Sequence, residues 1–131
     1  MTILLIDHDR NQHERFRELI RRIDASHQCL KAFSTETALF YLEDADNLLP
    51  DLIFLDLEFR AGGSKQLLRE LKNFSTLKKI PVCIYAEIRH DHDREEMQTL
   101  GAIGFVEKEV NFTNMLTSVR SVIESINEST N

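Results

Sequence analysis

Short, continuous apolar runs alternate along the chain with longer stretches in which apolar residues recur every three or four positions. A continuous apolar run between polar residues is typical of a strand that is covered on both faces of a sheet. Such strands are expected over residues 2–7, 28–33, 51–56, 81–86 and 102–106. The stretches that follow them favour amphipathic helices. These are expected over residues 10–23, 34–43 and 90–100, from about 64 onward, and from 111 to about 126.

Three polar or small residues mark the ends of these predicted helices. Ser34 and Asn111 stand directly before helical stretches, where their side chains can accept the first unpaired backbone N–H groups. Gly101 follows the fourth helical stretch and is expected to end it. The chain of 131 residues is long enough for one domain, expected over residues 1–127, with 128–131 as a frayed polar tail.

Strands that alternate with helices favour an α/β fold, in which helices cover both faces of a parallel sheet. In such sheets, ligands bind beyond the carboxyl ends of the strands, near the point where the strand order reverses. The residues that directly follow each predicted strand are therefore the candidates for a functional site.

The composition narrows the class of protein without naming it. Apolar residues make up 42% of the chain and charged residues 29%, as in ordinary globular proteins. A net charge of −6 argues against direct DNA binding. No apolar run approaches a membrane span and no secretory signal is evident, so a cytoplasmic protein is expected. Cys29 and Cys83 lie within apolar runs and are interpreted as reduced residues of the core.

Charged residues follow the predicted strands at the edge where ligands bind. Asp7 and Asp9 flank His8 after the first strand, Asp56 ends the third, and Lys108 follows the fifth. Clustered carboxylates repel one another unless a cation lies among them, and Mg²⁺ prefers such oxygen ligands. A carboxylate can also act as the nucleophile toward a phosphoryl group, whose charge a lysine can stabilise. The pattern favours phosphoryl chemistry at Asp56.

Four motifs, in this order and at these spacings, resemble a stand-alone, chemotaxis-regulator-like receiver domain of two-component response regulators. They are ILLIDHD, PDLIFLDLEF followed by GGSKQLL, KKIPVCIYA and LGAIGFVEK, within a resemblance that extends from Ile3 to about Ile126. The resemblance implies a flavodoxin-like, doubly wound, five-stranded parallel sheet of order 2-1-3-4-5 with five helices. It implies a phosphorelay partner, either a sensor histidine kinase or a phosphotransfer protein. It also implies a downstream protein partner at the face of helix 4, strand 5 and helix 5, with a homodimer as a further option.

The same resemblance assigns roles to individual positions. Asp56 matches the phosphoacceptor, and Lys108 matches the lysine that pairs with the phosphoryl group. Asp7 matches an acid of the Mg²⁺ site, to which Asp56 and the backbone carbonyl of Glu58 also contribute. Phe105 matches the aromatic switch position. No enzymatic activity is expected beyond phosphorylation and dephosphorylation of Asp56 itself.

Several positions depart from the family pattern. His8 replaces the second acid of the metal site, and imidazole is a poor ligand for Mg²⁺. Ala86 lacks the hydroxyl that would contact the phosphoryl group. Glu109 stands where the family usually has a cis proline, so a trans peptide bond is expected after Lys108. Arg60 also replaces a common proline. These departures leave open a pseudo-receiver that acts as a phosphorylation-independent interaction module.

Two further interpretations of the sequence involve other classes of protein. A strand that ends in Asp-x-Asp also resembles haloacid-dehalogenase-type phosphatases, with Asp7 as nucleophile and Asp9 as acid–base residue, although the late acidic motif of that family is missing. His90 and His92 flank a carboxylate and could suggest zinc, but a polar loop that opens a helix is the favoured interpretation. His13 and His27 are interpreted as surface residues.

Overall fold

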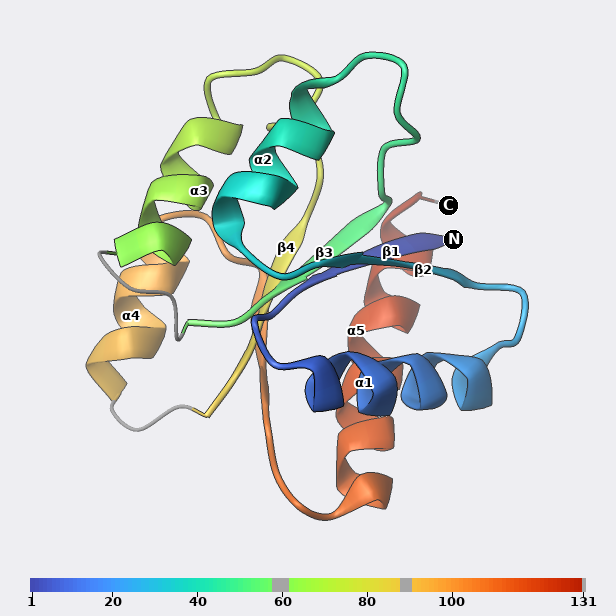
Figure 1. The fold of residues 1–131 in the computed structure, drawn as a ribbon. Coiled ribbons are helices and arrows are strands. Elements are labelled where there is room, and N and C mark those ends of the chain that lie inside the picture. Colours follow the sequence, from blue (N-terminus) through green and yellow to red (C-terminus); the bar gives the residue numbers. More distant parts are fainter. Residues whose placement is uncertain (58–61, 88–90, 131) are drawn as a thin grey trace.

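The computed structural model describes residues 1–57, 62–87 and 91–130. Its strands are β1 (Thr2–Ile6), β2 (Gln28–Ala32), β3 (Leu52–Leu55), β4 (Val82–Ala86) and β5 (Gly104–Glu107). Its helices are α1 (Arg10–Ile23), α2 (Thr35–Glu43), α3 (Gly63–Leu71), α4 (Asp91–Thr99) and α5 (Phe112–Thr130). The strands form one parallel sheet of order β2-β1-β3-β4-β5 (Figure 1), which confirms the predicted fold class.

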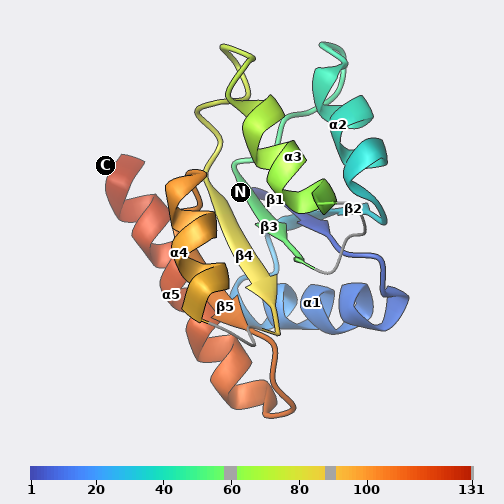
Figure 2. The same cartoon turned by 90° about the vertical axis from the view of Figure 1, so that its left-hand side faces the viewer.

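The helices cover the two faces of the sheet in two groups (Figures 1 and 2). Helices α1 and α5 pack on one face around Ile3, Leu5 and Phe54, whereas α2, α3 and α4 pack on the other around Leu4 and Ile6. Every residue of β3 and β4 is buried. Burial on both faces explains why these strands are continuous apolar runs instead of alternating apolar and polar positions.

The ends of the elements follow local sequence signals. The side chain of Ser34 accepts the backbone N–H of Thr37, and that of Asn111 accepts the backbone N–H of Asn114 at 3.0 Å, which confirms both predicted N-caps. Gly101, with φ of 105°, adopts a backbone conformation that favours glycine and turns the chain after α4. At this turn, Gly101 donates its backbone N–H to the carbonyl of Gln98, and Ala102 donates its N–H to the carbonyl of Met97.

The start of β5 differs from the prediction. The apolar run begins at residue 102, but β5 begins at Gly104 because the N–H of Ala102 is still bonded to the end of α4. Cys29 and Cys83 are both free thiols, but only Cys83 is buried in the core, whereas Cys29 is partly buried. Burial raises the pKa of the Cys83 thiol to about 12. Within the described ranges, no helix combines the length and apolar character needed to span a membrane.

Candidate functional site

Two buried carboxylates and one ammonium group meet at the carboxyl edge of the sheet. Asp7 directly follows β1 and Asp56 directly follows β3, and the pairing of Ile6 with Leu55 places them side by side. Both aspartates are fully buried. The Nζ atom of Lys108, which follows β5, lies 2.6 Å from Asp7 Oδ2 and 3.3 Å from Asp56 Oδ2. The predicted convergence of these three residues is therefore observed.

Backbone hydrogen bonds hold the two aspartates at this edge. The N–H of Asp56 donates to the carbonyl of Ile6, and the hydroxyl of Ser64 on α3 donates to the carbonyl of Asp56 at 2.7 Å. The N–H of Asp9 donates to Asp7 Oδ1 at 2.9 Å, so the second oxygen of that carboxylate is directed to Lys108. The carboxylates are thus positioned by the sheet and by the first turn of α3.

His8 lies at the mouth of this cluster, with about half of its side chain (53%) exposed. Its Nδ1 atom is 3.9 Å from Asp7 Oδ1 and 3.7 Å from Asp56 Oδ2, too far for direct hydrogen bonds. One ligand atom from each of the three residues lies within 4.8 Å of the others, a spacing that a divalent cation could bridge. The two carboxylates suit Mg²⁺, whereas the imidazole suits a softer ion such as Mn²⁺ or Zn²⁺ better.

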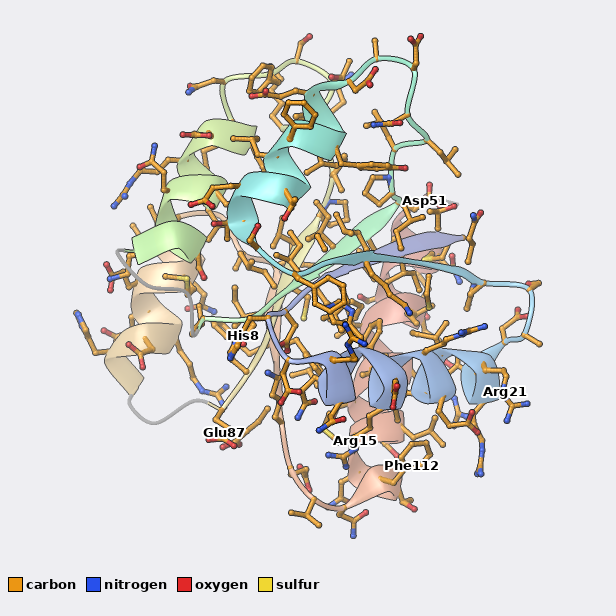
Figure 3. All side chains as sticks on the ribbon, in the orientation of Figure 1. His8, Arg15, Arg21, Asp51, Glu87 and Phe112 are labelled. Carbon is orange, nitrogen blue, oxygen red and sulfur yellow. The ribbon has the colours of Figure 1, made fainter. Side chains whose placement is uncertain are left out.

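A small hollow of about 90 Å³ opens over the cluster and is lined by His8, Asp9, Gln12, Glu87 and Lys108. Figure 3 shows His8 at the end of β1 and Glu87 at the end of β4, on the same edge of the sheet. The hollow gives a small ligand access from solvent to His8 and Lys108, which both contact the buried aspartates.

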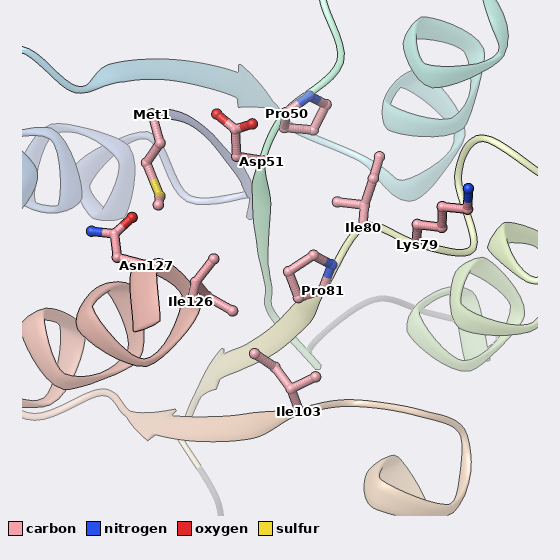
Figure 4. A pocket seen from close by; sticks show the side chains of 9 residues that line it. All are labelled: Met1, Pro50, Asp51, Lys79, Ile80, Pro81, Ile103, Ile126 and Asn127. Carbon is pink, nitrogen blue, oxygen red and sulfur yellow. The ribbon is translucent and has the colours of Figure 1, made fainter. Parts of the chain in front are cut away.

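A larger hollow of about 640 Å³ lies at the opposite edge, where the strands begin (Figure 4). It is lined by Met1, Pro50, Asp51, Lys79, Ile80, Pro81, Ile103, Ile126 and Asn127. None of the predicted site residues lines it, and parallel α/β sheets carry their ligands at the other edge. This hollow is separate from the candidate site.

Tyr85 on β4 packs against Lys108 of the charged cluster. It was not predicted from the sequence as a site residue. Lys108 Nζ lies 5.4 Å from the centre of its ring, and its hydroxyl donates to Gln12 Oε1 at 3.3 Å. The ring also packs edge-on against Phe16 and Phe54. Burial raises the pKa of the Tyr85 phenol. A tyrosine in an otherwise apolar buried strand was the available signal, because a buried hydroxyl usually has a partner.

The interpretation of His13 as a surface residue was wrong. Its side chain is buried, with Nε2 2.7 Å from the backbone carbonyl of Asp7 and the ring 4.6 Å from that of Phe33. The position of His13 three residues before Phe16 and seven before Ile20 places it on the buried face of α1. The helical spacing carried that information.

The predicted switch positions have unlike environments. Ala86 is fully buried at the end of β4, and its carbonyl accepts the N–H of Lys108 at 3.0 Å. Phe105 is half-buried, with the guanidinium of Arg94 5.4 Å from its ring centre. The bond between Lys108 and Glu109 is trans, as expected. The predicted carbonyl ligand at Glu58 and the departure at Arg60 lie outside the described residues.

The structure gives little support to the phosphatase and zinc interpretations. Asp9 is the N-cap of α1, where its side chain accepts the N–H of Asn11 at 2.8 Å. His92 is exposed on α4, 3.7 Å from Glu96, and His90 lies outside the described residues. His27 is half-buried and bonded to the amino terminus. An N-cap role for Asp9 differs from the acid–base role that a phosphatase would require.

The fold is a flavodoxin-like parallel sheet, and its carboxyl edge carries an acidic cluster paired with a lysine. The sequence matches the family model of the response regulator receiver domain over residues 3–120, so the chain belongs to that family. Receiver domains are generally signalling modules that interact with histidine kinases or phosphotransfer proteins, and Mg²⁺ and phosphoaspartate are typical of them. A search of curated proteins found no match.

Solved structures share this fold at low sequence identity. The phosphorylated cyanobacterial phytochrome response regulator RcpA is 24% identical with a TM-score of 0.82, and the alignment covers 94% of this chain and 91% of that one. The Mn²⁺-bound form of response regulator Rcp1 is 22% identical with a TM-score of 0.79, over 92% and 90%. A receiver domain from Rhodospirillum rubrum is 23% identical with a TM-score of 0.79, over 93% and 90%.

Proposed function

We propose that this receiver domain accepts a phosphoryl group on Asp56 from a histidine kinase or a phosphotransfer protein and signals by protein–protein contact. The observation that carries the proposal is the 3.3 Å contact between Asp56 Oδ2 and Lys108 Nζ under a solvent-accessible hollow. This contact supplies a nucleophilic carboxylate and a fixed positive charge next to the atom at which the phosphoryl group would be attached.

The transfer requires one bond to form and one to break. A carboxylate oxygen of Asp56 bonds to phosphorus as the phosphorus–nitrogen bond of the donor histidine breaks, and that nitrogen retains the electron pair. Lys108 stabilises the charge on the phosphoryl oxygens, while Asp7 holds the ammonium group in position through its 2.6 Å contact.

The donor set also fits a divalent cation. Asp7, Asp56 and the backbone carbonyl of Glu58 would hold Mg²⁺, with the ring of His8 as an additional ligand in place of the usual acid. A bound cation would further neutralise the phosphoryl oxygens. Because imidazole replaces a carboxylate, we expect weaker Mg²⁺ binding than in receivers that have the full acidic pair.

A phosphorylation-independent interaction module is the second candidate, and Ala86 favours it. A methyl group cannot donate a hydrogen bond to a phosphoryl oxygen. A modification without differential contacts in two conformations cannot shift the equilibrium between them. In either case the proposed contact surface for a downstream partner or a second copy is the α4–β5–α5 face, near which Val110 is 95% exposed and Ile103 is 51% exposed.

Acetyl phosphate with Mg²⁺, followed by intact-protein mass measurement, tests the proposal. We expect one phosphoryl adduct on the wild-type chain and on Asp9→Asn, which retains a residue suited to the N-cap. The adduct should be lost in Asp56→Asn. An unmodified wild-type chain, together with amide spectra that do not respond to beryllofluoride and Mg²⁺, would leave the interaction module as the function.

A further inference from the structure

A groove of about 380 Å³ lies between α2 and α3, away from the phosphoryl site. The two helices lie side by side on the same face of the sheet (Figures 1 and 2). The groove is lined by Thr35, Glu36, Leu39, Phe40, Glu43, Gly63, Gln66, Leu67 and Glu70. Each wall consists of residues at helical spacing, so the groove runs between two continuous helix faces.

The groove has an apolar floor that reaches solvent. Leu67 is buried and Leu39 is partly buried against the core, whereas Phe40 is 80% exposed. The environment of Phe40 differs from that of Phe16 and Phe54, which are both fully buried. A large exposed apolar side chain beside an apolar groove is typical of a surface that contacts another molecule.

The rim of the groove is acidic. Glu36 and Glu43 stand on α2 and Glu70 on α3, and among the described lining residues there is no lysine or arginine. Two basic side chains, Lys65 on α3 and Lys72 directly after it, make contacts elsewhere. Lys65 pairs with Glu96 on α4 at 2.8 Å, and Lys72 lies against Gly101.

The sequence around α2 strengthens this charge asymmetry. Residues 32–59 contain no lysine or arginine. The acids in this segment are Glu36, Glu43, Asp44, Asp46, Asp51, Asp56 and Glu58. Since Asp56 is buried with Lys108, the exposed part of this excess lies mainly on α2 and the loop after it. The field at the groove therefore favours a positively charged partner.

We propose that the α2–α3 groove binds a basic amphipathic helix of a partner protein. An apolar side chain of that helix packs between Phe40 and Leu67, and its lysine or arginine residues face the glutamates of the rim. Glu36 and Glu43 are two helical turns apart, about 10.5 Å along α2, which matches basic residues at positions i and i+7 of the bound helix. Such helix-in-groove binding combines apolar anchors with charge complementarity. It requires no phosphorylation of Asp56, so it goes beyond the proposed function.

A synthetic amphipathic peptide is a suitable probe. It carries a stripe of leucines at helical spacing and lysine at the positions that flank this stripe, including two lysines seven residues apart, and its control carries glutamate in place of each lysine. We expect the lysine peptide to bind at least about tenfold more tightly in fluorescence anisotropy, and to bind more weakly as salt increases. Amide chemical shifts should change on α2 and α3 and remain unchanged on α4, β5 and α5.

Matched variants test whether binding depends on the groove itself or only on the net negative charge of the chain. The double substitution Glu36→Gln and Glu43→Gln should weaken binding about tenfold. The control double substitution of Glu14→Gln and Glu124→Gln, which removes the same charge from exposed positions on α1 and α5, should have little effect. Phe40→Ser should also weaken binding, whereas Val110→Ser, at an apolar position that is still more exposed, should not.

Several outcomes would overturn the proposal. One is equal binding of the two peptides, and another is equal weakening by the two double substitutions. Shifts centred on α4, β5 and α5 would also reject it. A wild-type chain that sediments as a dimer and becomes monomeric only in Phe40→Ser would assign the groove to a second copy of the chain instead. Circular dichroism confirms that each variant is folded before binding is compared.

Discussion

The two halves of the candidate site differ in how far they retain the family pattern. At the ends of β1 and β3, and after β5, Asp7, Asp56 and Lys108 form a buried cluster with contacts of 2.6 and 3.3 Å. At the end of β4, Ala86 offers only a methyl group, while Phe105 on β5 is half-buried. The acceptor half, formed by Asp7, Asp56 and Lys108, holds the residues proposed to accept a phosphoryl group. The switch half, formed by Ala86 and Phe105, lacks the hydroxyl that would contact that group. Acceptance and conformational response can therefore be separated by mutation.

The largest effect is expected in the acceptor half, from Lys108→Met. The substitution leaves Asp7 and Asp56 buried together without the ammonium group that contacts both. Loss of one partner from a buried ionic cluster reduces the free energy of unfolding by about 3–5 kcal/mol. Urea denaturation measures this loss, and added Mn²⁺ should recover part of it by neutralising the two unpaired carboxylates.

Lys65→Met is the matched control because it breaks a partly exposed pair with Glu96 instead of a buried one. Exposed ion pairs contribute little, so its urea midpoint should remain close to that of the wild type. Equal midpoints for Lys108→Met and Lys65→Met would contradict the view that Lys108 neutralises the acceptor half.

The next largest effect is expected in the switch half, from Ala86→Ser. In the free protein, a hydroxyl at this buried position should reduce the free energy of unfolding by about 1–2 kcal/mol. With beryllofluoride bound to Asp56, the hydroxyl gains a charged acceptor, and such a hydrogen bond can strengthen binding by roughly tenfold or more. Titration followed by the amide signals around Phe105 measures both the affinity and the response.

Ala102→Ser controls for the burial of a hydroxyl away from the site, since Ala102 is also buried (9% exposed). It should leave beryllofluoride affinity unchanged. If Ala86→Ser binds beryllofluoride no better than the wild type, the missing hydroxyl is not what distinguishes the two halves.

A smaller effect is expected from His8→Asp, which restores the acidic pair. A third carboxylate should strengthen Mg²⁺ binding by about tenfold, because ligand charge tunes affinity for hard cations. The wild type, with an imidazole nitrogen, should prefer Mn²⁺ to Mg²⁺, and the variant should lose most of this preference. Isothermal titration calorimetry measures both affinities.

His92→Asp, on the exposed surface of α4, adds the same charge elsewhere and should change neither affinity. A wild type that prefers Mg²⁺ would contradict the ligand role of His8.

The acceptor half was predictable because its placement depends on strand ends. Each of Asp7 and Asp56 terminates an apolar run, and parallel strands end at the same edge, so the pattern places both aspartates at one edge of the sheet. The order of the sheet came from the family resemblance. The distances could not be predicted: whether Lys108 lies nearer to Asp7 or to Asp56 depends on side-chain packing above Tyr85.

The contacts of His13 and Tyr85 were not predicted from the sequence. Each residue bonds to a group outside its own element, His13 to the carbonyl of Asp7 and Tyr85 to the side chain of Gln12. The spacing of α1 placed His13 on the buried face, but it did not identify the acceptor. Contacts between residues as far apart as 12 and 85 exist only after the helix and the sheet have packed together.

The smallest effect at neutral pH is expected from Tyr85→Phe. The ring that packs beneath Lys108 remains, and only the 3.3 Å hydrogen bond to Gln12 is lost, so the free energy of unfolding should fall by less than about 1 kcal/mol. Urea denaturation at pH 7 measures this difference. A loss as large as that of Lys108→Met would mean that the hydroxyl, instead of the ring, supports the acceptor half.

The same substitution has an opposite consequence at alkaline pH. Burial raises the pKa of the Tyr85 phenol above its ordinary value of 10.0. The unfolded chain then releases this proton first as the pH rises through that value, so the folded state binds more protons and loses stability. Tyr85→Phe removes this loss. Its free energy of unfolding should decline less steeply than that of the wild type above pH 10, and parallel declines would show that the phenol ionises equally in both states.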